Sequence, residues 1–163
     1  MDVLIRDVGH HDWHTLTQIF NHYVEHSPAA YPEEPVGETF FRNLHMSAPD
    51  YPFLVAEQTG QVRGFAYLSP FHGATTMRHT AVVTYFLHPK STGAGIGTRM
   101  LHQLMEHGRD LGIRCYLAHI SSLNEGSIRF HLTHGFEICG RFREVGFKHG
   151  APFDMIWMQR IVT

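Results

Sequence analysis

The fold is decided by the stretch HPKSTGAGIGT, residues 88–98, which joins a strand pattern to an amphipathic helix pattern. Before it, residues 80–87 (TAVVTYFL) are almost all β-branched, aromatic or apolar, which predicts a central strand buried on both faces. After it, Ile96, Met100 and Leu104 recur at helical spacing. Three glycines in five residues let backbone N–H groups approach a ligand, and the positive end of the following helix points to the same place. The stretch therefore predicts a pyrophosphate site.

Other glycine loops fit this stretch less well. A Walker A loop needs a lysine directly after its last glycine, and here Gly97 is followed by Thr98. A Rossmann loop has the spacing GxGxxG near the N-terminus, whereas this loop has GxGxG and follows the fourth predicted strand. A helix-start loop that binds no ligand is the simplest alternative, because a lone glycine motif is weak evidence.

Periodicity and turn residues predict short strands and helices on both sides of the loop. Strands are expected at 3–5, 53–57, 62–68, 80–87, 115–120, 137–143 and 153–161, and helices at 14–26, 38–46, 96–110 and from the N-cap Asn124 to about His134. The resulting order, βααβββαβαββ, predicts an α/β (α+β) fold with a mixed central sheet, part antiparallel and part parallel, flanked by helices.

Composition limits the class of protein. The 163 residues fit one domain, residues 1–163. Thirteen Lys and Arg against fifteen Asp and Glu give a net charge of −2, which argues against a nucleic-acid binder. No apolar run reaches the roughly 20 residues of a membrane span, and the start has no signal-peptide pattern. Cys115 and Cys139 suggest neither a disulfide framework nor a metal site. We expect a cytoplasmic protein that binds neither nucleic acid nor membrane.

Fifteen histidines are an unusually high number for this length. They raise the possibility of a metal-binding protein, but His10, His11 and His14 sit at a helix start and no HExxH pattern occurs. Scattered surface or half-buried imidazoles explain the count more simply. We therefore expect no metal, and a formal charge that changes strongly below about pH 6.5.

The order of motifs points to a known family. A strand, a GxG loop, a helix, a strand and an Asn-capped helix resemble the GNAT superfamily of acyl-CoA-dependent N-acyltransferases over nearly the whole chain. At finer grain the sequence resembles the phosphinothricin/methionine sulfoximine N-acetyltransferase family. The segments that carry this resemblance are Asn21-His22-Tyr23, Thr80–Leu87 with the glycine loop, Asn124–His131, Gly135-Phe136, and Arg143–Gly150 with Asp154 and Gln159.

The resemblance implies acetyl-CoA as co-substrate and assigns residues to it. Backbone groups of Tyr85, Phe86 and Leu87 would pair with the pantetheine arm like an added strand. Asn124 would bind near the thiol end, or be only a helix cap. His131 would protonate the departing thiolate as general acid, or be only a half-buried histidine. The pyrophosphate would lie on the amides of Gly93, Ala94, Gly95, Ile96, Gly97 and Thr98.

The sequence also departs from the family pattern. Thr92 stands where the superfamily usually has Gln or Arg, and Gly93 where the narrower family often has Arg. Val82 stands where the narrower family has the glutamate proposed as general base. The basic residue expected to bind an amino-acid carboxylate aligns near Ala74, and Arg78 is the nearest substitute. These departures put phosphinothricin-like substrates in doubt but leave acyl-CoA binding intact.

We therefore expect transfer of an acetyl group from acetyl-CoA to a primary amine of a small molecule by direct attack, with an amino-acid-like compound as one candidate acceptor. An amide near Phe86 would stabilise the oxyanion, worth about 2.7–4 kcal/mol. His119, His79 or a water chain would take the proton of the amine. The alternative is an acyl-CoA-binding module with reduced or lost catalysis, which the Val82 substitution favours. A homodimer is expected from the resemblance and from an aromatic-rich C-terminal third, comprising Phe142, Phe147, Phe153 and Trp157.

Overall fold

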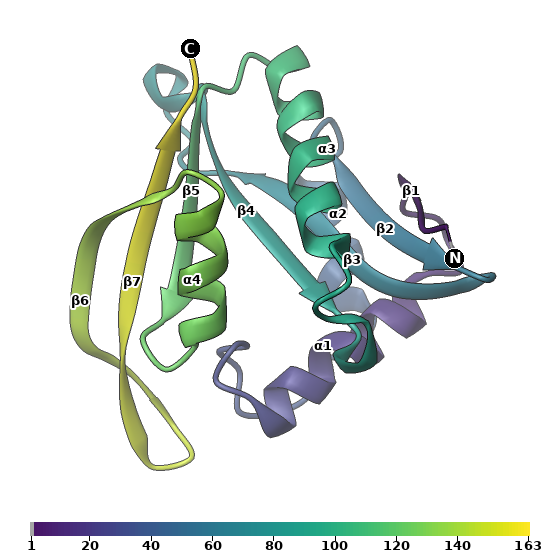
Figure 1. Ribbon diagram of the computed structural model, residues 1–163, viewed down its shortest axis with the longest axis horizontal. Coiled ribbons are helices and arrows are strands. Elements are labelled where there is room, and N and C mark those ends of the chain that lie inside the picture. The colour runs from purple at the N-terminus through teal and green to yellow at the C-terminus, as the bar shows by residue number, and fades with distance from the viewer. Residues whose placement is uncertain (1) are drawn as a thin grey trace.

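A computed structural model describes residues 2–163, and its helices and strands follow the predicted order (Figure 1). The α-helices are α1 (Trp13–His26), α2 (Thr39–Ser47), α3 (Ile96–Asp110) and α4 (Glu125–Thr133). The strands are β1 (Leu4–Asp7), β2 (Phe53–Gln58), β3 (Gln61–Pro70), β4 (Thr80–Leu87), β5 (Cys115–Ser121), β6 (Glu137–Lys148) and β7 (Ala151–Ile161). Short 3-10 turns occur at Thr75–Met77 and Pro89–Ser91.

The strands of residues 2–163 form one seven-stranded sheet in the order β1-β2-β3-β4-β5-β7-β6. β4, the strand before the glycine loop, is therefore central, as the sequence predicted. Neighbouring strands are antiparallel except β4 and β5, which run parallel. The predicted mixed sheet flanked by helices is confirmed.

The parallel pairing of β4 with β5 is short. It covers only Thr80–Val82 opposite Cys115–Leu117, although both strands continue well beyond these residues. Figure 1 shows the two strands close together at one end and spread apart at the other. The sheet is therefore open between the second half of β4 and the second half of β5.

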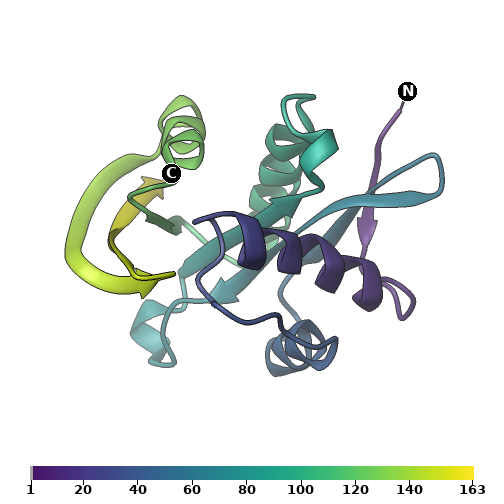
Figure 2. The same cartoon turned by 90° about the horizontal axis from the view of Figure 1, so that it is seen from below.

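Helices cover both faces of the sheet. Figure 2 shows α3 and α4 on one face and α1 and α2 on the other. Alternate residues of β4 contribute to the two cores, with Ala81 and Val83 in the core beside α3 and Phe86 against the core beside α1 and α2. Side chains of β4 near the opening thus reach both faces.

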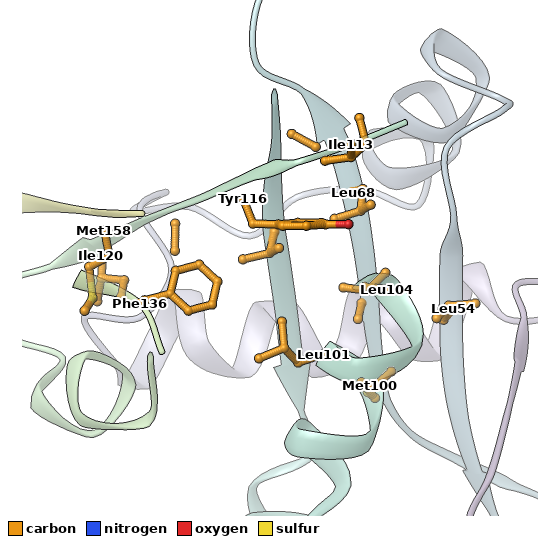
Figure 3. Packing of buried hydrophobic residues seen from close by; sticks show 14 of the residues in the cluster. Leu54, Leu68, Met100, Leu101, Leu104, Ile113, Tyr116, Ile120, Phe136 and Met158 are labelled. Atoms are coloured by element: carbon orange, nitrogen blue, oxygen red, sulfur yellow. The ribbon is translucent and has the colours of Figure 1, made fainter. Parts of the chain in front are cut away.

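The buried ring of Tyr116 fixes α3 to β5. Figure 3 shows this ring among the leucines of the α3-side core. Its hydroxyl donates to the Met105 carbonyl at 3.1 Å. A Cβ atom at Gly108 would collide with the Tyr116 ring, so the close approach of helix and strand requires glycine there. This contact holds the axis of α3, and with it the direction in which the helix N-terminus points.

The last two strands are longer than predicted. The sequence placed them at 137–143 and 153–161, but they continue to Lys148 and begin at Ala151. The turn between them uses His149 and Gly150, both with positive φ (51° and 78°). A register shift between Phe142 and Gly146 interrupts the pairing. This irregularity hides the period-two alternation from which the end of a strand is predicted.

Candidate active site

A cleft of about 1020 Å³ fills the opening between β4 and β5. It is lined from both faces of the sheet, by residues of α1, α2, α4, the glycine loop and the connection after α1. A cavity of this size is large enough for an extended ligand. Ten of the predicted site residues line it, and nine of them are Tyr85, Phe86, Leu87, Gly93, Gly95, Gly97, Thr98, Asn124 and His131. His119 lines it as well.

β4 presents a free backbone edge to this cleft. Phe86 lies opposite Phe65 of β3, and the next even-numbered residue, His88, donates its amide to the Arg63 carbonyl at 2.7 Å. Backbone groups alternate in direction along a strand, so the odd-numbered residues point away from β3 and toward the opening. Tyr85 therefore offers main-chain groups to the cleft, and Leu87 offers its amide, because the Leu87 carbonyl accepts a hydrogen bond from the Tyr23 hydroxyl. The backbone of Phe86, expected there from the sequence, is turned toward β3 instead.

The glycine loop ends in the N-terminus of α3. Gly93 and Gly95 have φ of 77° and 79°, and a Cβ atom at either would meet nothing within 4 Å. Gly95 is the N-cap, and no side chain caps the helix there. The first amides of α3 consequently have no intrahelical acceptor, and the helix dipole adds positive potential. The loop can hold an anionic phosphate group on backbone N–H groups, in an exposed cradle that side chains do not fill.

His131 forms a hydrogen-bonded pair with Tyr85. Its side chain is buried, and its Nδ1 lies 2.7 Å from the Ser127 carbonyl, an acceptor that requires a proton on Nδ1. Nε2 then accepts a hydrogen bond from the Tyr85 hydroxyl. Burial lowers the pKa of His131 to about 4 and raises the pKa of Tyr85 well above its ordinary value. At pH 7 the ring is therefore neutral, with its proton on Nδ1 and with Nε2 facing the Tyr85 hydroxyl.

His119 pairs with a second tyrosine on the other face of the sheet. Its Nδ1 lies 3.0 Å from the Tyr31 hydroxyl, and the two rings stack with centroids 5.6 Å apart. Burial lowers the pKa of His119 below its ordinary 6.5 and raises the pKa of Tyr31 to about 12. The imidazole is therefore neutral at pH 7, as a proton acceptor must be. Val82 also lines the cleft, and its side chain points away from the α3-side core that holds its neighbours Ala81 and Val83.

Asn124 has a clear structural role. Its Oδ1 accepts the Ser127 amide at 3.3 Å, which confirms that it caps α4. This bond leaves the Nδ2 donors of the side chain outside the cap, on a residue that lines the cleft.

Four other residues considered from the sequence do not line the cleft. Ile96 is buried in the core beside α3, and Ala94 is exposed on the loop, so only their backbone amides are relevant. Arg78 and His79 are exposed and precede β4, at the end where that strand still pairs with β5. The structure thus brings neither the proposed carboxylate-binding arginine nor the alternative base to the opening.

The sequence reasoning missed three tyrosine hydroxyls and a lysine. Tyr85 and Tyr31 are the partners of the two histidines, and Tyr23 donates to the Leu87 carbonyl at 2.5 Å. Lys148 donates to carbonyls at the end of α1 and beyond, at Tyr23, Ser27 and Ala30. Tyr31 lies in an irregular connection without periodicity, so no sequence pattern pointed to it.

Residues 16–136 match the Acetyltransferase (GNAT) family. This segment contains β4, the glycine loop, α3 and α4, which together form the cleft. The chain belongs to the GNAT acetyltransferase family. As a GNAT protein it is an acetyl-CoA-dependent N-acetyltransferase, as the sequence predicted.

Relatives support the same conclusion. The GNAT chain is 32% identical to the L-methionine sulfoximine/L-methionine sulfone acetyltransferase of Salmonella typhimurium, over 95% of this chain and 92% of the relative. It is 30% identical to the L-amino acid N-acyltransferase of Escherichia coli, over 91% and 87% of the two chains. A phosphinothricin acetyltransferase from Sinorhizobium meliloti, solved in complex with acetyl-CoA, is 33% identical and superposes with a TM-score of 0.90, over 99% of this chain and 89% of that chain.

Two further observations on residues 2–163 concern metal ions and membranes. No group of three or more His, Cys, Asp or Glu side chains in this range could hold a metal ion, in spite of the fifteen histidines. No helix in the described range is long and apolar enough to cross a membrane.

The buried His131 predicts a loss of stability in mild acid. Its pKa of about 4 in the folded protein lies below the ordinary 6.5, so between these values the unfolded chain binds the proton and the folded chain does not. The free energy of unfolding should therefore fall by about 2–3 kcal/mol from pH 7 to about pH 4.5 because of this residue.

Urea unfolding of the wild type and of His131→Asn at both pH values measures this contribution. The variant should lose most of the pH dependence assigned to His131, whereas His10→Asn, which removes an exposed histidine, should keep the wild-type dependence. An equal pH dependence in wild type and His131→Asn would contradict the assignment.

Proposed function

We propose that this GNAT enzyme transfers the acetyl group of acetyl-CoA to a primary amine of a small molecule, by direct attack of the amine on the thioester. The observation that carries the proposal is the cleft through the sheet, where the free edge of β4 meets the uncapped N-terminus of α3. One end of this cleft suits a phosphate, the middle suits an extended chain, and both faces hold a neutral histidine.

The residues that would hold acetyl-CoA are those the sequence predicted, with one change. Amides of Gly93–Thr98 would bind the pyrophosphate, and Tyr85 and Leu87, rather than Phe86, would pair with the pantetheine arm. A main-chain amide on this edge would also donate to the thioester oxygen as negative charge develops there. Asn124 would bind near the thiol end through its Nδ2 donors. The bound co-substrate supplies the activated acetyl group.

Tyr85 and His131 would accept and then return the proton that moves during acetyl transfer. As the C–N bond forms and the C–S bond breaks, one proton leaves nitrogen and one reaches sulfur. The Tyr85 hydroxyl can accept the proton that leaves nitrogen while it donates its own proton to Nε2 of His131. The two transfers then reverse, and the Tyr85 hydroxyl donates a proton to sulfur. An imidazolium with a pKa of about 4 is a strong enough acid to release that proton readily.

His119 is the candidate for the first deprotonation of the amine. It lines the cleft, as does Val82, the position where the family pattern has a glutamate, and it is neutral at pH 7. The Tyr31 hydroxyl can donate to Nδ1 or accept from it, so the ring can take either tautomer. His79, at the exposed start of β4, has no comparable position.

A binding module without catalysis is the second candidate, and the specific observation in its favour is the apolar Val82 in the cleft. Release of CoA thiol in the presence of a panel of primary amines separates the two. Turnover above the background hydrolysis supports an enzyme, and binding of acetyl-CoA without any turnover supports the module.

Acetyl-CoA should raise the melting temperature through the glycine loop. At 100-fold excess over Kd, binding stabilises the folded state by about 2.7 kcal/mol, or about 5–10 °C for a chain of this size. Gly95→Asp should abolish the shift, because it places a negative side chain where a phosphate would lie. Gly60→Asp is the matched control, since Gly60 has a similar φ of 76° in the turn between β2 and β3. An undiminished shift in Gly95→Asp would remove the loop from the co-substrate site.

Tyr85→Phe and His131→Asn should each slow turnover about 10²-fold or more while leaving acetyl-CoA affinity nearly unchanged. Because the two groups act as one unit, the double variant should be about as slow as the slower single variant. Steady-state kinetics together with thermal shifts by acetyl-CoA provide both readouts. If the two losses multiply, the side chains act separately and the proposed relay is wrong.

We also propose that residues 1–163 act as one domain in the cytoplasm. A single sheet that contains strands from both ends of the chain supports the first point. The free cysteines Cys115 and Cys139 fit a reducing compartment and support the second.

A homodimer is the assembly that the surface of β6 supports. This edge strand exposes Ile138, Phe142, Val145 and Phe147, each more than half exposed. Exposed apolar side chains in this number on one edge strand are typical of an interface. Of the aromatic residues expected there, Phe153 is instead buried in the chain.

Light scattering at micromolar concentration should therefore give about twice the 18.7 kDa mass of the chain. The double change of Phe142 and Phe147 to Asp should reduce it to one chain mass. Leu4→Asp, at an exposed apolar residue on the opposite edge strand, should leave the dimer intact. A wild-type mass of one chain would exclude the dimer.

A further inference from the structure

The acceptor side of the cleft carries no fixed charge. We call this side, between β4 and the α1 and α2 face of the sheet, the acceptor chamber; it is lined from α1, the connection at 27–32, α2 and the facing residues of β3, β4 and β5. Among residues 2–163, no Asp, Glu, Lys or Arg lines the chamber or any other part of the cleft. Its one imidazole, His119, has a pKa lowered by burial and is neutral at pH 7.

The cation that packs against this region has its donors occupied. The Lys148 ammonium group donates to the carbonyls of Tyr23, Ser27 and Ala30, at 3.4, 2.8 and 2.5 Å. An ammonium group has three N–H donors, so none is left for a ligand. Turning Lys148 toward a carboxylate would deprive these carbonyls of their partner and release the connection that presents Tyr31. Arg78 is exposed and does not line the cleft.

Aromatic rings form much of the chamber instead. They come from five separate elements and are Phe20, Tyr23, Tyr31, Phe40, Tyr67 and Phe86. Some are held by ring contacts, as Tyr31 is stacked on Phe153 with centroids 5.7 Å apart and rings parallel within 1°. Fixed aromatic faces bind apolar groups and attract an ammonium group through cation–π contact before it loses its proton.

A carboxylate placed in such a chamber would be desolvated without a counter-charge, which is strongly unfavourable. We propose that the acceptor of this enzyme is a primary amine on an apolar carbon skeleton without a carboxylate, such as an arylalkylamine, rather than an amino acid. The inference depends on the proposed function and specifies its substrate class. It separates this chain from the relatives named above for amino acids and their analogues.

Three matched amines test the charge directly: 2-phenylethylamine, L-phenylalanine and L-phenylalanine amide. The amide has nearly the size of the amino acid but no negative charge. CoA release gives kcat/KM for each, expressed per free-base amine so that differences in amine pKa cancel. We expect the amine and the amide to lie within about tenfold of each other, and the amino acid at least 100-fold below both.

The possible results distinguish an error in the substrate class from an error in the proposed function. An amino acid that reacts as well as the amine would overturn the inference and leave the proposed function in place. An amide as poor as the amino acid would show that size, not charge, sets the limit, and would overturn it too. If no primary amine is turned over by a protein that binds acetyl-CoA, the proposed function fails, and the inference fails with it.

Discussion

The early end of the β4–β5 pairing is the constraint on which the rest of the structure depends. After Val82 the strands separate, and backbone groups of β4 that would normally bond a neighbouring strand face the opening, where the Leu87 carbonyl accepts from Tyr23 instead of from a strand. Unpaired groups on a central strand are costly unless a ligand or water satisfies them. The open edge of β4 is therefore suited to bind an extended ligand through its main chain. The N-terminus of α3 adds positive potential at the point where that ligand would leave the sheet.

Because the two strands separate, β4 also places side chains in two different sites, one on each face of the sheet. Tyr85 reaches the α3 and α4 side, where it meets His131, whereas Val82 lies on the opposite side with His119. Each histidine is buried enough to be neutral at pH 7, and each has a tyrosine hydroxyl as partner. Burial therefore lowers the pKa of both histidines and keeps each imidazole neutral, so that it can accept a proton.

Sequence patterns predicted the parts of the molecule that depend on local spacing. The element order, the central strand 80–87, the glycine loop and the Asn124 cap all follow from periodicity and from residues with special backbone properties. The roles of Tyr31, Tyr85 and Lys148 could not be predicted, because each depends on contact between segments far apart in the chain: 46 residues separate Tyr85 from His131, and 88 separate Tyr31 from His119. The direction of the Phe86 backbone likewise required the register with β3.

The surroundings of Val82 in the acceptor chamber explain why a carboxylate is missing at this position. Viewed alone, it is a missing carboxylate and suggests lost catalysis. Within the chamber, it is one of many positions without charge, and among residues 2–163 the titratable groups that line the chamber are tyrosines and a neutral histidine. A buried glutamate at this position would face no cation, so its own pKa would rise and the fold would be destabilised. Among residues 2–163, the chamber thus has neither a carboxylate nor a cation that could bind one. The two absences are consistent with each other, because either charge alone would be unpaired there.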